Sequence, residues 1–326
     1  MKQRQLGKTG YQVSEIGIGC WQFGGDFGPI EDAVSMATLD AADAHGVTFY
    51  DTADVYGGGR SEHIIGDFTA NKPQSLHIAT KVGRMPALYP DNYAADDVER
   101  HLRDSAERLQ TDCLDLVQLH CVPPAILRDG EIFKTMDALV EKGITKYWGA
   151  SVETLAEAEM CLAHPGCASL QIIFNLYRQD AAWALFEKAH AANVGIIVRL
   201  PLASGILTGK FSATHQFAAD DHRNFNRDGA YFSVGETFSG IEQQKAVALL
   251  AHITPLVPEG WSLADFALRW ILDHEAVSSI IAGCSRPAHI EANARASELP
   301  PLPAETHAAL KVLYESEIRP LIRCPI

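Results

Sequence analysis

Residues 31–51, EDAVSMATLDAADAHGVTFYD, contain one helix-to-strand step that the rest of the chain repeats. The first two thirds predict a helix, because small and apolar side chains recur at intervals of three and four residues, at Ala33, Met36, Ala37, Ala41 and Ala44. Gly46 is a residue that ends helices, and the run VTFY at 47–50 has the composition of a buried strand. This strand is followed directly by Asp51, a side chain that can take part in chemistry.

The same alternation predicts eight strands separated by helices. The expected strands are 14–20, 47–50, 76–80, 114–119, 145–150, 169–174, 195–199 and 278–282. The expected helices are 31–44, 60–68, 96–109, 131–141, 154–163, 181–192, 241–254 and 263–272. Short apolar strands covered by helices indicate a parallel α/β sheet, and eight strands are the number that closes a (β/α)₈ TIM barrel.

A doubly wound open sheet is the competing fold. It is disfavoured because the first strand lacks a GxGxxG turn, and Trp21 and Phe23 occupy positions that a phosphate-binding loop keeps small. We therefore expect residues 1–326 to form a single barrel domain with an N-terminal β-hairpin that turns at 8–10. A long irregular segment, 211–240, follows the seventh strand, and its aromatic residues favour a packed lid over a disordered linker.

Composition narrows the classes of function. The 326 residues are 47% hydrophobic and carry a net charge of −14, which argues against a nucleic-acid partner. No apolar run is long enough to span a membrane, and the N-terminus lacks the apolar region of a signal peptide. The seven cysteines form no CxxC pair and the thirteen histidines show no HxH or HExxH spacing, so we expect a cytoplasmic protein without a metal site.

Three successive predicted strands end in residues that could move protons. Asp51 follows the second strand and Tyr56 lies five residues later, while Lys81 and His120 end the next two strands. In a barrel these four side chains would converge on one mouth. Each residue alone is more often a cap, a loop anchor or a packing residue, but their coincidence at successive strand ends favours a catalytic set.

The chemistry of this set is that of carbonyl reduction. A free phenol has a pKa near 10, and an adjacent ammonium group at Lys81 would lower the pKa of Tyr56. Asp51 would keep the buried Lys81 charged, and His120 would hydrogen-bond the substrate oxygen. Tyr56 is then the proton donor to that oxygen.

These residues lie in sequences that resemble the aldo-keto reductase family. The resemblance includes DTADVYGGGRSEHIIG, ATKVG and LDLVQLH, and it continues in order through KGITKYWGAS, SLQIIFNLY, IIVRLPLASGILTGKF and IIAGCSRPAHIEANARA. It implies a (β/α)₈ barrel that binds a nicotinamide dinucleotide across its carboxyl-end mouth. It also implies a catalytic tetrad of Asp51, Tyr56, Lys81 and His120.

The resemblance further implies a set of cofactor contacts. Ser151 and Gln171 would bind the nicotinamide carboxamide, and Ser285 and Arg286 would hold the adenosine 2′-phosphate. The remaining expected contacts are Gly19, Trp21, Arg199, Leu202, Ser204, Gly205, Leu207, Lys210, Gly283, His289 and Asn293. Two positions depart from the family pattern, because Val152 stands where Asn is common and Arg199 stands where an aromatic residue stacks on the nicotinamide ring. Ser285 and Arg286 at the start of a helix favour NADP, whereas His289 stands where Gln is common, so NAD stays possible.

We therefore expect an NAD(P)-dependent oxidoreductase that interconverts an aldehyde, ketone or sugar carbonyl and the corresponding alcohol. Candidate walls of the substrate pocket are Trp21, Phe23, residues 85–89, residues 121–122 and the lid aromatics. One alternative is a non-catalytic subunit that binds a nicotinamide nucleotide and senses redox state. A metal-dependent hydrolase is a second alternative, which the missing histidine motifs disfavour.

Overall fold

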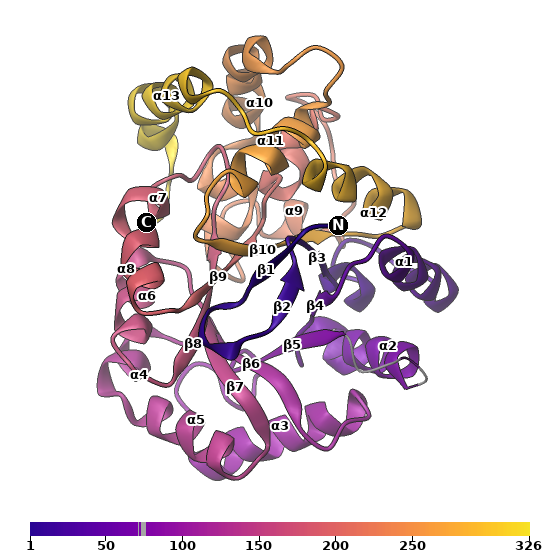
Figure 1. Cartoon of the computed structure of the whole chain (residues 1–326), viewed down its shortest axis with the longest axis vertical. Coiled ribbons are helices and arrows are strands. Elements are labelled where there is room, and N and C mark those ends of the chain that lie inside the picture. Colours follow the sequence, from indigo (N-terminus) through magenta and orange to yellow (C-terminus); the bar gives the residue numbers. More distant parts are fainter. Residues whose placement is uncertain (71, 73–75) are drawn as a thin grey trace.

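Eight parallel strands close into a barrel in the computed structural model, which describes residues 1–70, 72 and 76–326 (Figure 1). Around the barrel the order is β10, β3, β4, β5, β6, β7, β8 and β9. The strands are β3 (Ile16–Gly19), β4 (Phe49–Asp51), β5 (His77–Val82), β6 (Leu114–His120), β7 (Thr145–Ser151), β8 (Cys167–Ile173), β9 (Gly195–Arg199) and β10 (Val277–Gly283). The predicted barrel is therefore confirmed.

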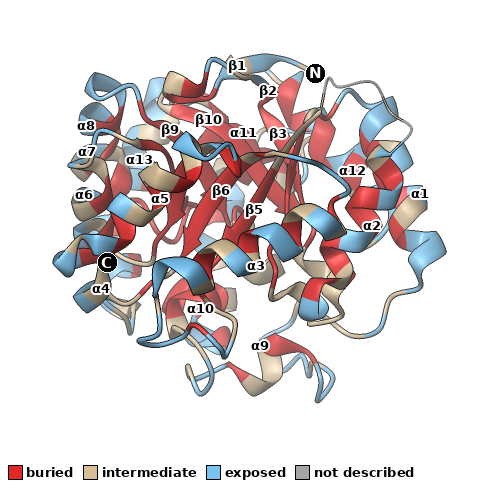
Figure 2. Cartoon of the chain, turned by 90° about the horizontal axis from the view of Figure 1, so that it is seen from below, coloured by how far each residue is buried: buried red, intermediate tan, exposed pale blue. Residues whose placement is uncertain are grey.

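Helices surround the barrel, and most of them turn buried residues toward the strands and exposed residues outward (Figure 2). They are α1 (Asp32–Ala44), α2 (Arg60–Thr69), α3 (Ala95–Arg108), α4 (Pro124–Asp129), α5 (Glu131–Glu141), α6 (Leu155–Leu162), α7 (Ala181–Ala184), α8 (Phe186–Ala191), α9 (His222–Phe225), α10 (Gln243–Ile253), α11 (Leu263–Leu272), α12 (Pro287–Ala294) and α13 (Ala304–Leu313). Among the described residues, no helix combines the length and the apolar character needed to cross a membrane.

The expected N-terminal hairpin is also confirmed. Strands β1 (Gln3–Gln5) and β2 (Gln12–Ser14) pair in antiparallel fashion, and a short 3₁₀ turn over Gly7–Thr9 joins them. The Lys8 amide donates to the Asn193 carbonyl just before β9, so the hairpin lies across the amino-terminal end of the barrel. Figure 2 shows β1 and β2 at the opposite end of the molecule from α9.

Several predicted bounds need correction. The expected first strand, 14–20, is divided, because Ser14 ends the hairpin and β3 begins only at Ile16. The expected helix 181–192 is two short helices, because Leu185 between them has φ −123°. Helices α4 and α13 were not expected. The predicted bounds of α5, β9 and α11 match the structure.

Strand register places the predicted site residues at one level of the barrel. Gly19 of β3 pairs with Asp51 of β4. His120, Ser151 and Gln171 are successive partners across β6, β7 and β8. Gly19, Asp51, His120 and Ser151 end their strands, and Gln171 lies two residues before the end of β8. All five are therefore near the carboxyl end of the barrel, where the sites of such folds are built.

The long irregular segment after the seventh barrel strand is present as expected. We call residues 211–240 the lid; it contains α9 and two short 3₁₀ turns, Val234–Glu236 and Phe238–Gly240. Its aromatic residues pack against one another, with Phe217 against Phe211 and Phe238, and Phe225 against Tyr231. Trp21 of the barrel mouth contacts His222 and Phe232 of the lid.

Candidate active site

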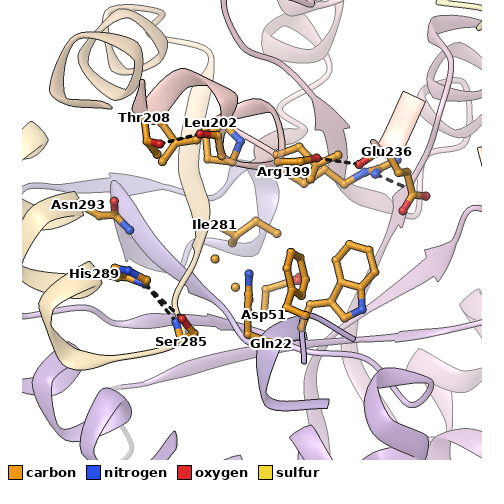
Figure 3. A pocket seen from close by; sticks show the side chains of 18 of the residues that line it. Gln22, Asp51, Arg199, Leu202, Thr208, Glu236, Ile281, Ser285, His289 and Asn293 are labelled. Atoms are coloured by element: carbon orange, nitrogen blue, oxygen red, sulfur yellow. Dashed lines mark hydrogen bonds and ion pairs between the residues drawn. The ribbon is translucent and has the colours of Figure 1, made fainter. Parts of the chain in front are cut away.

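A cavity of about 560 Å³ opens at the carboxyl end of the barrel, and most of the predicted site residues line it. Figure 3 shows Ser285, His289 and Asn293 gathered on one side of this cavity, and Arg199 and Glu236 on another. The expected residues that line it are Gly19, Trp21, Asp51, Tyr56, His120, Ser151, Gln171, Arg199, Leu202, Ser204, Gly205, Lys210, Gly283, Ser285, His289 and Asn293.

Asp51, Lys81 and Tyr56 form a connected chain of contacts beneath the cavity. Lys81 is fully buried, and its Nζ donates to Asp51 Oδ1 at 2.5 Å and to the Thr52 carbonyl at 2.7 Å. The same Nζ lies 3.1 Å from Tyr56 Oη. The loop after β4 positions this phenol, because Gly57 and Gly58 have φ of 61° and 63°, a turn that favours glycine.

The second carboxylate oxygen of Asp51 is held by two amides. Gln118 Nε2 donates to Asp51 Oδ2 at 3.0 Å, and Gln171 Nε2 donates to it at 2.7 Å. Ser151 Oγ donates to Gln171 Oε1 at 3.2 Å, so the expected carboxamide-binding pair is linked to the Asp51 carboxylate. Both oxygens of a buried anion are thereby satisfied, as burial of a charge requires.

Burial decides the protonation of Tyr56 and Lys81. Burial raises the pKa of Tyr56 to about 12 and outweighs the opposing effect of the Lys81 ammonium. The expectation of a lowered pKa is therefore wrong for the net value, although Lys81 acts in the expected direction. Burial alone would lower the pKa of Lys81, but Asp51 and Tyr56 raise it, so the amine is charged and the phenol is neutral near pH 7.

His120 faces the same cavity as a neutral imidazole. Burial lowers its pKa well below the ordinary value, and Arg84, Lys81 and Arg199 lower it further. Its ring centroid lies 5.9 Å from that of Tyr56. His120 Nδ1 is buried and has no hydrogen-bond partner among the residues that the structure describes. The imidazole can thus take part in a hydrogen bond to a ligand without carrying a charge.

The predicted phosphate residues cluster at the far side of the cavity. Arg286 Nε donates to His289 Nε2 at 3.0 Å, and His289 Nδ1 lies 3.5 Å from Ser285 Oγ, so His289 connects the serine and the arginine. Burial lowers the pKa of His289, as do Arg286 and Lys210. Asn293 donates to Cys284 Sγ at 3.4 Å.

The segment 202–210 forms a tight loop at the cavity wall. Ser204 and Gly205 have φ of 55° and 96°, and a Cβ at position 205 would lie 2.8 Å from the Phe211 ring. Glycine is therefore required there by both backbone and space. Arg223 of the lid extends to this loop, with its Nη1 3.5 Å from the Ser204 carbonyl.

Three predicted site residues do not line the cavity. Lys81 lies behind Asp51 and Tyr56, Leu207 is fully buried in the core, and Arg286 contacts the cavity only through His289. Of the expected substrate walls, Trp21 and the lid residue Phe211 line the cavity, together with the unexpected Phe27. Phe23 belongs to the core instead, because it is fully buried.

The two departures from the family pattern contact each other. Arg199 Nη2 donates to the Val152 carbonyl at 3.0 Å, and Arg199 Nη1 lies 3.6 Å from Glu236 Oε1 (Figure 3). Glu236 also accepts from Arg84 Nη2 at 2.8 Å, and Arg84 pairs with Glu153 at 2.7 Å. Burial alone would raise the pKa of Glu236, but Arg84 and Arg199 lower it to about 2.

A group of possible metal ligands lies beside Arg84 and Arg199. Ligand atoms of Cys121, Glu153 and Glu236 lie within 4.8 Å of one another. Arg84 and Arg199 already pair with these carboxylates, and their positive charges oppose a cation there.

Sequence reasoning missed several residues of the site. Gln118 could have been found, because it precedes His120 by two positions on β6 and therefore faces the same side of the strand. Arg223 and Glu236 carried no such signal, because they lie on the lid, where no periodicity fixes the path of the chain. Gln22 also lines the cavity without having been expected.

The cavity fits a nicotinamide dinucleotide. Two buried polar atoms of residues that line the cavity with Tyr56, His120 Nδ1 and Arg199 Nε, have no hydrogen-bond partner among the described residues. Lys210, Arg223 and Ser285 line the cavity near the tight loop and α12, where the phosphates of an extended dinucleotide would need donors. One continuous space therefore offers both a reactive end and an anion-binding end.

Comparison with known proteins agrees with this geometry. Residues 15–315 match the family model described as "Aldo/keto reductase family". The chain is 30% identical over 329 residues to aldo-keto reductase str7 of Strobilurus tenacellus, covering 97% of this chain and 93% of the relative. It is 28% identical to the aldo-keto reductase YhdN of Bacillus subtilis, over 90% of this chain and 87% of the relative. It is 27% identical to a probable voltage-gated potassium channel subunit beta of Arabidopsis thaliana, over 93% of each.

Solved structures show the same fold. The holo form of the aldo-keto reductase AKR11C1 from Bacillus halodurans superposes with a TM-score of 0.77 at 24% identity, over 96% of each chain. The glycerol dehydrogenase AKR11B4 from Gluconobacter oxydans gives a TM-score of 0.79 at 24% identity, over 100% of this chain and 97% of that one. The chain belongs to the aldo/keto reductase family.

Proposed function

We propose that this oxidoreductase uses NADP to interconvert an aldehyde, ketone or sugar carbonyl and the corresponding alcohol, with Tyr56 as the proton donor. The observation that carries the proposal is the chain of contacts from Asp51 through Lys81 to Tyr56 at the floor of the mouth cavity. Lys81 Nζ lies 2.5 Å from Asp51 Oδ1 and 3.1 Å from Tyr56 Oη. A neutral phenol beside a buried ammonium can give up a proton and leave a stabilised phenolate.

The residues of this chain act on the carbonyl oxygen, and a reduced nicotinamide, when bound, would supply a hydride to the carbonyl carbon. As the C=O π bond breaks, its electron pair moves to the oxygen, and Tyr56 Oη transfers its proton there. Lys81 stabilises the phenolate that remains, and a solvent proton restores the phenol. His120 orients the substrate oxygen as a neutral hydrogen-bonding group, and the aromatic walls exclude water.

NADP is proposed over NAD because of the residues around α12. His289 is hydrogen-bonded to Ser285 on one side and to Arg286 on the other, and Lys210 lies near enough to lower the pKa of His289. A 2′-phosphate carries up to two negative charges, so a cluster of donors with two cations favours it over a plain ribose hydroxyl. Asn293, in the same wall, would face the adenine.

The pocket above Tyr56 suits a small and partly apolar carbonyl compound. The Trp21 ring stacks on Tyr56 with centroids 5.8 Å apart, and Phe27 packs edge-on against Trp21 at 5.1 Å. Trp21 Nε1 donates to Asp26 at 2.7 Å, which fixes the indole over the phenol. Such walls limit the substrate near its carbonyl group to a flat or narrow shape.

The test is a titration followed by turnover. Purified protein is titrated with NADPH and with NADH by cofactor fluorescence, and then a panel of aldehydes, ketones and aldoses is assayed with the cofactor that binds more tightly. We expect NADPH to bind at least tenfold more tightly than NADH, and saturable NADPH oxidation with small aldehydes. Absence of binding to either cofactor would overturn the proposal.

A second candidate function is a nucleotide-binding subunit that senses redox state without turnover. It is favoured by the similarity to a probable potassium channel subunit beta, a resemblance that covers 93% of this chain. The cofactor titration and carbonyl panel described above distinguish the two functions, because a non-catalytic subunit would bind the cofactor but reduce no compound of the panel. The complete Asp51–Lys81–Tyr56 arrangement favours the enzyme.

We also propose a cytoplasmic location. All seven cysteines are free thiols, as expected in a reducing compartment.

A further inference from the structure

The position of the nicotinamide ring follows from the chemistry of the proposed function, on which this inference rests. A hydride can reach a carbonyl carbon only if the ring lies beside a carbonyl whose oxygen contacts Tyr56. The ring must therefore lie on the barrel floor between Tyr56 and the phosphate-binding residues. Arg199 ends β9, where it pairs with Ile173 of β8, and the side chains of Arg199 and Gln171 both line the cavity.

The Arg199 guanidinium is held in place at the cavity wall. Arg199 is 8% exposed, and two of its nitrogens are engaged by the Val152 carbonyl and by Glu236. Its buried Nε has no partner among the described residues. A planar group that is fixed, lines the cavity and retains an unused donor is suited to lie against a ring that carries an acceptor.

The charges around the ring position do not cancel evenly. Asp51 and Lys81 form a neutral pair, and Tyr56 and His120 are neutral near pH 7. Arg84 and Arg199 lie beside Glu153 and Glu236, so the formal charges of these four side chains cancel in sum. The pairing is uneven, because Glu236 Oε1 lies 2.8 Å from Arg84 and 3.6 Å from Arg199, and Glu153 also pairs with Arg84. Arg199 is therefore the less tightly paired of the two cations, and of the two it is the one that lines the cavity.

We propose that Arg199 lies against the nicotinamide and makes the site bind the reduced cofactor in preference to the oxidised one. The oxidised ring carries a positive charge that the reduced ring lacks, so a nearby guanidinium repels only the oxidised form. The site then retains NADPH and releases NADP⁺ more readily, and the potential of the bound couple lies above that of the free couple. A neutral aromatic residue at this position would lack that discrimination.

The test compares the dissociation constants of NADPH and NADP⁺ for three proteins, measured by quenching of protein fluorescence. For the wild type, the ratio of the NADP⁺ constant to the NADPH constant is expected to be about tenfold larger than for Arg199→Met. Arg199→Lys keeps the charge and is expected to keep the ratio within threefold of the wild type. A tenfold ratio corresponds to about 30 mV in the potential of the bound couple.

The ratio of the two dissociation constants separates an effect of charge from an effect of structure. A general loss of packing would weaken the binding of NADPH and NADP⁺ equally and leave this ratio unchanged. Equal ratios for wild type and Arg199→Met would overturn the inference, as would a loss of discrimination in Arg199→Lys. Should Arg199→Met fail to fold, Glu236→Gln decides the matter, because removing the balancing charge is expected to increase the ratio and an unchanged or smaller ratio contradicts the inference. If the wild type binds neither cofactor, the proposed function fails instead.

Discussion

Lys81 is an ammonium group that is fully removed from solvent, and it remains charged because of its neighbours. The ammonium group of Lys81 donates three hydrogen bonds, to the Asp51 carboxylate, to the Thr52 carbonyl and to the Tyr56 hydroxyl. Taking a charge out of water costs several kcal/mol unless a partner compensates it. The pair therefore holds a positive charge next to the phenol, and it is stable only while both members are present.

Replacing Lys81 by Met should damage both stability and activity. It leaves the Asp51 carboxylate buried with only the amides of Gln118 and Gln171 as donors. We expect a loss of about 3–5 kcal/mol in the free energy of unfolding, measured by urea denaturation. The double variant Asp51→Asn, Lys81→Met removes both charges and should regain most of that stability while carbonyl reduction stays absent. Equal stability of the single and double variants would contradict the ion-pair account.

The protonation states of Tyr56 and His120 predict a flat pH profile. Burial raises the pKa of Tyr56 to about 12, so the phenol keeps its proton at every pH below that value. Burial lowers the pKa of His120 well below its ordinary value, so the imidazole is neutral at pH 6 and above. We expect kcat for reduction to change less than threefold between pH 6 and pH 9 in a steady-state series. A tenfold fall across that range would show that one of the two groups titrates there.

At the scale of single elements, the lid depends on a buried histidine. His222 of α9 is fully buried, with its ring centroid 4.7 Å from Trp21 and 4.4 Å from Phe27. Burial lowers the pKa of His222 to about 4 and outweighs Asp221, whose Oδ1 lies 3.8 Å from Nδ1; neither ring nitrogen has a hydrogen-bond partner among the described residues. The lid is therefore packed against the neutral form of this ring.

Acid should loosen this packing. The folded pKa of His222 is about 4 and the unfolded pKa is about 6.5, so the unfolded chain binds more protons between these values and stability falls as pH falls through this range. Between pH 7.5 and pH 5 we expect the wild type to lose about 2 kcal/mol more unfolding free energy than His222→Phe. The exposed His63, replaced in the same way, serves as the control and should leave the pH dependence as it is. A wild type and His222→Phe with parallel pH dependences would argue against the buried neutral ring.

Sequence periodicity predicted the elements well where one side of a helix or strand faces the core. The helix Glu131–Glu141 and the strand Gly195–Arg199 were predicted to the residue, because buried positions such as Met136 and Ile197 recur at the proper spacing. The break at Leu185 and the helix α4 after Pro123 were not visible, because packing between neighbouring helices decides them. The same holds for α13, whose only buried residue is Leu310.

At the scale of the whole molecule, the site combines distant segments that the barrel closure brings together. The four tetrad residues could be predicted because Asp51, Lys81 and His120 lie at strand ends, Tyr56 follows one of these ends by five residues, and strand ends meet at one mouth. The cluster of charged side chains formed by Arg84, Glu153, Arg199 and Glu236 could be predicted only in part. Arg199 and Val152 stood out in the sequence, but their contact and the role of Glu236 depend on the path of the lid, which local patterns do not determine.

The cavity joins most of the barrel strands, so cofactor binding should stabilise the entire fold. Binding to the native state alone adds about 2.7 kcal/mol at a ligand concentration one hundred times the dissociation constant. We expect NADPH to raise the melting temperature more than NADH does at equal concentration, measured by calorimetry. Ser285→Ala with Arg286→Met should remove this difference and leave the NADH shift unchanged. If the double variant keeps the preference for NADPH, the phosphate site lies elsewhere.

The central claim is that Tyr56 donates the proton to the carbonyl oxygen, and the most direct test compares wild type with Tyr56→Phe. The measurement is kcat for NADPH oxidation with the best aldehyde of the panel, together with the dissociation constant of NADPH for each protein. We predict a fall in kcat of about 10²–10⁴-fold, with the NADPH constant within twofold of the wild type. A variant that binds NADPH normally and retains kcat within threefold of the wild type would contradict the account.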